Sequence, residues 1–190
     1  MKAITVFLVL LSSSFLHAQT LEDVSKAMDH AVFPVMKSHK FMGVMPVKNP
    51  ILPMQATDKY KLVIDLVASS DDSVKVNFGI TDIGRTFNLH VANGASPKNL
   101  DIIVVAHGPA VWSLLTNEAF EKKYGIPNPN IDFITELNQH NVKFFVCGQN
   151  LTIMNIAPEE LVSEVQVALS AKTALTHFQS LGYVVFEFRD

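Results

Sequence analysis

The only cysteine in this 190-residue sequence, Cys147, lies in the stretch VKFFVCGQNL. A lone cysteine cannot form an internal disulfide, so it is either a small buried side chain or a thiol that does chemistry. The apolar run before it predicts a strand, and Gly148 lets the backbone turn sharply and approach a ligand closely. A helical turn starting at Gln149 would favour a thiolate at Cys147. On pattern alone, both interpretations of the thiol stay open.

Two other titratable residues lie in strand-like apolar runs. His107 closes the run LDIIVVA, and it could pair with the Cys147 thiolate or receive its proton. A structural role, in which the imidazole bonds a backbone carbonyl, is the alternative. Asp65 lies inside the run KLVIDLV, so it needs a polar partner if it is buried. It could position a ligand or make a structural hydrogen bond.

The candidate binding residues cluster around the expected strand ends. Trp112, the only tryptophan, follows the second strand and could line a pocket or simply pack. The predicted binding set is Asp65, Gly108, Trp112, Gly148, Gln149 and Asn150. The remaining histidines are scattered without the spacing of a zinc site, and no glycine-rich phosphate loop occurs. We therefore predict no metal site and no cofactor.

Five β-rich runs alternate with helical patterns along most of the chain. The expected strands are 60–68, 100–108, 142–147, 164–169 and 183–188, and the expected helices are 76–91, 111–115, 118–124, 128–140 and 170–182. Asn128 is expected to cap its helix, and Gly94 to close the first one. Such alternation predicts an α/β fold with a mainly parallel sheet and helices on both faces. Ligands bind at the carboxyl ends of such strands, where the candidates lie.

The N-terminal residues differ in kind from the rest. Residues 1–18 have the layout of a secretory signal peptide, with Lys2, a short apolar run and a cleavage site after Ala18. We therefore expect an exported protein, periplasmic or secreted, with no membrane span in the mature chain. Residues 19–57 are predicted to form a short helix and a proline-rich arm that wraps the domain or a neighbouring subunit. Residues 58–190 then form the α/β domain.

Composition narrows the classes of partner. The formal net charge is −3, 48% of the residues are hydrophobic, and no cluster of lysine and arginine stands out. These features are typical of an ordinary globular protein of one domain, and they argue against a nucleic-acid partner.

Several segments resemble the DsrE/DsrF-like family across about residues 60–186. They are KLVIDLV, FNLHVANGASPKNLDIIVVAHGPAVWSLL, VKFFVCGQNL and VALSAKTALTHFQSLGYVVF, and the most specific pieces are the strand ends VAHG and FVCGQ. The resemblance implies a five-stranded, flavodoxin-like α/β sandwich that commonly assembles into trimers or hexamers. It also implies sulfur relay, in which a cysteine, here matching Cys147, carries sulfur as a persulfide between proteins.

Three functional hypotheses follow. The first is an exported homo-oligomeric sulfur carrier that uses Cys147, with His107 as a helper and a sulfur donor or acceptor protein as partner. The second is a module that binds a small ligand in a crevice lined by His107, Trp112, Cys147 and Gln149, without turnover. The third is a purely structural assembly unit in which Cys147 is buried.

Overall fold

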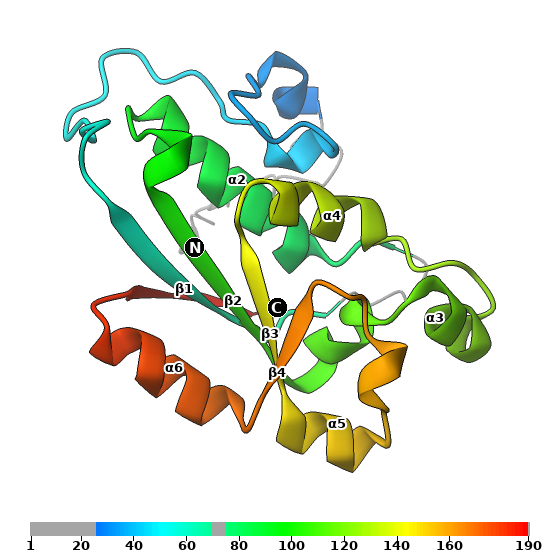
Figure 1. Cartoon of the computed structure of the whole chain (residues 1–190). Helices are drawn as coiled ribbons and strands as arrows, with labels where there is room; N and C mark the ends of the chain where they lie inside the picture. Colours follow the sequence, from blue (N-terminus) through cyan, green and yellow to red (C-terminus); the bar gives the residue numbers. More distant parts are fainter. Residues whose placement is uncertain (1–25, 70–74, 190) are drawn as a thin grey trace, which may run out of the picture.

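The computed structural model describes residues 26–69 and 75–189 and contains a five-stranded sheet (Figure 1). The strands are β1 (Tyr60–Leu66), β2 (Leu100–Ala106), β3 (Lys143–Cys147), β4 (Val165–Ala168) and β5 (Val184–Phe188). Their order is β4-β3-β2-β1-β5, and every neighbouring pair is parallel. The predicted parallel α/β sheet is confirmed, and its five strands match the five expected runs.

The helices also follow the predicted order. They are α2 (Phe78–Ala92), α3 (Asn117–Tyr124), α4 (Ile131–Gln139), α5 (Gly148–Met154) and α6 (Ala171–Ser180), together with the 3₁₀ helix η4 (Gly108–Leu114). Shorter 3₁₀ turns occupy Met28–His30, Lys40–Met42, Pro97–Asn99 and Pro158–Glu160. Gly94 has a φ of 111° as expected after α2, and a Cβ there would lie 2.5 Å from the carbonyl oxygen of Met54.

The start of α4 differs from the prediction that Asn128 caps it. Helix α4 begins at Ile131, because Asn128 folds a turn of its own before the helix. The Asn128 Oδ1 accepts from the backbone N–H of Asn130 at 2.9 Å, and its amide nitrogen donates to the carbonyls of Ser113 and Leu115. Asn128 therefore links the segment before α4 to the end of η4.

The sheet separates two cores of unequal size. Alternate side chains such as Leu62 and Ile64 point into the large core, whereas Val63 and Val105 point to the other face. In Figure 1, α2 and α4 lie on one side of the sheet and α6 lies on the other. Helix α6 packs along β1 to β4 and contributes Ala171 and Ala174 to the small core. One face is thus thickly covered, and the other is covered mainly by one helix.

The N-terminal arm packs on its own domain. Met36 and Met42 are fully buried in the large core, and Met42 lies against Gly84 of α2. The predicted signal peptide, 1–18, lies outside the described residues, as does the start of the predicted N-terminal helix up to residue 25; the described part of that helix contains the 3₁₀ turn Met28–His30. Between residues 26 and 189, leaving out 70–74, no helix has both the length and the apolar character needed to cross a membrane.

Candidate functional site

Cys147 is the last residue of β3 and the residue that precedes α5. Its side chain is only 6% exposed and belongs to the small core, together with Val105, Ala171 and Ala174. The sequence left open whether this thiol is buried or reactive, and the structure places it in the core. The physical reason is the direction of the side chain, which points toward α6 instead of into the turn after the strand.

The helical turn predicted to start at Gln149 is confirmed, but it starts one residue earlier. Helix α5 begins at Gly148, and a Cβ at Gly148 would lie 2.8 Å from the carbonyl oxygen of Ala168 in β4. The close approach that glycine permits is thus made by a neighbouring strand. Gln149 is near the same strand, since its side-chain nitrogen donates to the Leu169 carbonyl at 3.4 Å.

His107, which is partly exposed, and the buried Asp65 form a polar pair at the carboxyl ends of β1 and β2. The Nε2 of His107 lies 2.7 Å from Oδ1 of Asp65, and Nη2 of Arg189 donates to the other carboxylate oxygen at 3.0 Å. The prediction that Asp65 needs a polar partner is confirmed. Because a carboxylate can only accept, Nε2 carries the hydrogen and Nδ1 of the neutral ring keeps its lone pair.

The sheet register brings His107 close to Cys147. Ala106 pairs with Val146, so His107 and Cys147 stand at corresponding positions on adjacent strand ends, about 4.8 Å apart between strands. The backbone N–H of Gly108 donates to Oδ1 of Asn150 at 3.0 Å, which ties the two strand ends together. The hydrogen bonds of the described residues include none between the thiol and the imidazole.

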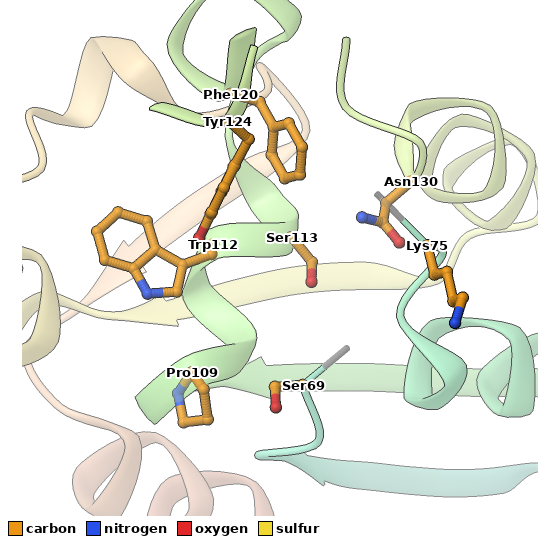
Figure 2. A pocket seen from close by; sticks show the side chains of 8 residues that line it. All are labelled: Ser69, Lys75, Pro109, Trp112, Ser113, Phe120, Tyr124 and Asn130. Carbon is orange, nitrogen blue, oxygen red and sulfur yellow. The ribbon is translucent and has the colours of Figure 1, made fainter. Parts of the chain in front are cut away.

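Trp112 lies on the other side of the sheet. It packs against the large core, whereas Cys147 belongs to the small one, so the predicted crevice shared by His107, Trp112, Cys147 and Gln149 is not formed. Trp112 instead helps to form a cavity of about 180 Å³ at the carboxyl ends of β1 and β2 (Figure 2). The lining residues are Ser69, Lys75, Pro109, Trp112, Ser113, Phe120, Tyr124 and Asn130.

A buried asparagine network supports this cavity, and the sequence reasoning missed it. The side chain of Asn77 accepts from Gly79 and donates to Ser113 Oγ at 2.9 Å, and its backbone N–H donates to Asn130 Oδ1 at 2.8 Å. The signal was present, because asparagine just before a helix is a favoured cap residue. No cluster of three or more histidine, cysteine, aspartate or glutamate side chains suited to a metal occurs among residues 26–69 and 75–189.

Comparison with known proteins identifies the family. The DsrE/DsrF-like family model matches residues 63–188, from within β1 to the end of β5. The solved structure of MTH1491, a protein of unknown function from Methanobacterium thermoautotrophicum, is 20% identical, with a TM-score of 0.52 over 68% of this chain and 100% of that chain. YchN from E. coli is 19% identical over 68% of this chain and 99% of its own, with a TM-score of 0.49. No curated protein matches the sequence. Since the family model covers more than half of the sequence, the chain belongs to the DsrE/DsrF-like family.

Proposed function

We propose that this protein is a sulfur carrier in which Cys147 holds one sulfane sulfur as a persulfide and passes it to a partner thiol. Membership of the DsrE/DsrF-like family supports a role in sulfur relay in general. The observation that carries it is the arrangement of Cys147 beside His107, whose ring is oriented by Asp65. A nucleophile next to a base that a third group orients is the arrangement used in nucleophilic catalysis.

The chemistry is a thiol–persulfide exchange. The Cys147 thiol gives its proton to Nδ1 of His107, and the thiolate attacks the outer sulfur of a donor persulfide, R–S–SH. A new S–S bond forms on Cys147 while the donor's S–S bond breaks, and R–S⁻ leaves with the electron pair. The imidazolium then protonates R–S⁻, so a thiol and a persulfide exchange places and no oxidant or reductant is consumed. The same exchange in reverse delivers the sulfur to an acceptor thiol.

The burial of Cys147 places a requirement on this function. The small core that contains the thiol is closed by Ala171 and Ala174 in the first turns of α6. These side chains are small, and α6 is the helix that covers this face of the sheet. In this proposal the start of α6 shifts to admit the donor, a local opening that costs less than global unfolding.

Export and assembly complete the proposal. The mature chain would begin after Ala18 and act outside the cytoplasm, which an intact mass of the natively expressed protein tests directly. Exposed apolar side chains in and directly after the edge strand β4, Val167 at 49% and Leu169 at 73%, support docking of a second copy or a sulfur-transfer partner there. Sedimentation of the mature protein measures whether a trimer or a hexamer forms.

The first prediction concerns sulfur uptake. Incubation with a low-molecular-weight persulfide, followed by mass spectrometry, is expected to add about 32 Da, one sulfur atom, at Cys147. Cys147→Ser should gain nothing, and Asp65→Asn should slow the uptake because His107 loses the carboxylate that orients it. Asp101→Asn is the matched control, since its carboxylate contacts Tyr183 and not His107. An unmodified Cys147 in the presence of a reactive small-thiol control would contradict the proposal.

The burial of Cys147 also favours a second candidate, a structural assembly unit in which the thiol only fills the core. Maleimide labelling separates the two functions. The carrier predicts slow but complete labelling of the native protein through local opening, faster than global unfolding allows. The structural unit predicts labelling only at the rate of global unfolding.

A further inference from the structure

The cavity beside Trp112 has no role in the proposed sulfur chemistry, because it lies across the sheet from Cys147. We propose that this cavity is a separate binding site for a small planar carboxylate. It opens at the carboxyl ends of β1 and β2, the edge at which parallel sheets bind ligands. Figure 2 shows the side chains of Trp112, Phe120, Tyr124 and Asn130 placed around a central space above Ser69 and Pro109.

Two deeply buried side chains in the wall retain unused hydrogen-bond donors. Ser113 is 6% exposed, and its Oγ accepts from Asn77, so the hydroxyl hydrogen remains. Asn130 is 2% exposed; its oxygen accepts from the Asn77 backbone and its nitrogen donates to Asn128, which leaves its second N–H. The hydrogen bonds of the described residues give neither hydrogen an acceptor. A buried donor without an acceptor is costly, so both favour a ligand that accepts.

The aromatic wall adds a third donor. Burial raises the pKa of Tyr124 above its usual value, so its phenol stays protonated at neutral pH. Its hydroxyl has no acceptor among the described residues. Among the described residues that line the cavity, none is an aspartate or a glutamate. A carboxylate has two oxygens that can accept from such donors at once.

The aromatic side chains of the cavity and the positive charge beside it indicate what the ligand carries besides its carboxylate. Trp112, Phe120 and Tyr124 supply flat apolar surfaces, which suit a planar body packed by stacking or edge-to-face contact. The ammonium of Lys123 lies 3.8 Å from the centre of the Trp112 ring and brings a positive charge to the rim. The Asn77, Asn128 and Asn130 hydrogen bonds hold the donors in place before the ligand arrives, which reduces the entropic cost of binding.

Titration of the intact protein with benzoate tests the proposal. Trp112 is the only tryptophan in the chain, so its fluorescence reports on this cavity alone. We expect a saturable change with benzoate, a weaker one with benzamide, which lacks the charge, and none with benzylamine, which carries the opposite charge. Calorimetry should give the same dissociation constant. Equal binding of benzamide, preferential binding of benzylamine, or no saturation with benzoate would each overturn the assignment.

Point variants then locate the binding. Tyr124→Phe keeps the ring and removes one donor, and Ser113→Ala removes another; each should weaken benzoate binding about tenfold. Lys123→Gln should weaken it about threefold, while Lys122→Gln, a neighbour on α3 that lies outside this cavity, should not. If Ser113→Ala does not fold, as circular dichroism would show, Tyr124→Phe decides. Unchanged affinity in Tyr124→Phe overturns the proposal. Cys147→Ser should bind normally, so the result is independent of the sulfur-carrier function.

Discussion

The alternation of side chains along β3 decides which residues the Cys147 thiol contacts. Lys143, Phe145 and Cys147 share one face of the strand, and Phe145 packs in the same small core. The sequence shows that the cysteine ends a strand. Its exposure depends on α6, a helix that begins 24 residues later in the sequence and crosses above it.

The second prediction tests the close contact at Gly148. Gly148→Ala places a Cβ 2.8 Å from the Ala168 carbonyl oxygen and 3.2 Å from Cγ1 of Val167, so β3 and β4 must separate. We expect a loss of about 1–3 kcal/mol in the free energy of unfolding, measured by urea denaturation. Gly125→Ala is the control, because nothing lies near its Cβ and only the positive φ opposes the change. A smaller loss at Gly148 than at Gly125 would contradict the argument.

At the scale of elements, the short 3₁₀ turn Lys40–Met42 fastens the N-terminal arm and depends on a neutral histidine. The Nδ1 of His39 accepts from the backbone N–H of Phe41 at 3.2 Å, and the ring lies edge-on to Phe133 at 5.4 Å. Burial lowers the pKa of His39 below its usual value of 6.5. Protonation at Nδ1 would remove the acceptor for the Phe41 N–H, and it would place a positive charge in a partly buried site.

The third prediction follows from this lowered pKa. Below pH 6.5 the unfolded chain takes up a proton at His39 before the folded chain does, so stability falls as the pH drops toward the lowered folded pKa. The contribution is fully present above pH 6.5. His39→Asn keeps a side-chain acceptor for Phe41 and removes the titration, so its unfolding free energy should fall less over this acidic range. Identical pH profiles for the two proteins would disprove the assignment.

At the scale of the whole molecule, one side chain joins the arm to the domain. Asn88 of α2 is fully buried, and its Oδ1 accepts from the N–H groups of Val35 and Met36. Its Nδ2 donates to the carbonyls of Met36 and Met42 at 2.8 Å. The amide thus completes four hydrogen bonds to a segment about fifty residues earlier in the chain.

The fourth prediction is that Asn88→Ala detaches the arm. It leaves buried N–H and C=O groups of the arm without partners, which we expect to cost about 2–4 kcal/mol of unfolding free energy. Limited proteolysis should then cleave within residues 26–57 before the rest of the chain. Asn93→Ala, which removes one exposed hydrogen bond to Leu52, is the control and should change little. Equal protease resistance of the Asn88 variant and the natural protein would contradict this role.

The sequence by itself determined the five strands, their parallel α/β arrangement and the family, because strand runs, helix periodicity and the motifs around His107 and Cys147 are local patterns. It also indicated that Asp65 needs a partner. Only the tertiary structure decided that His107 and Arg189 are those partners, and that Cys147 is covered while Trp112 faces a different cavity. Those outcomes depend on strand order and on which helix covers which face. Both are set by packing between residues far apart in the chain, which no local pattern records.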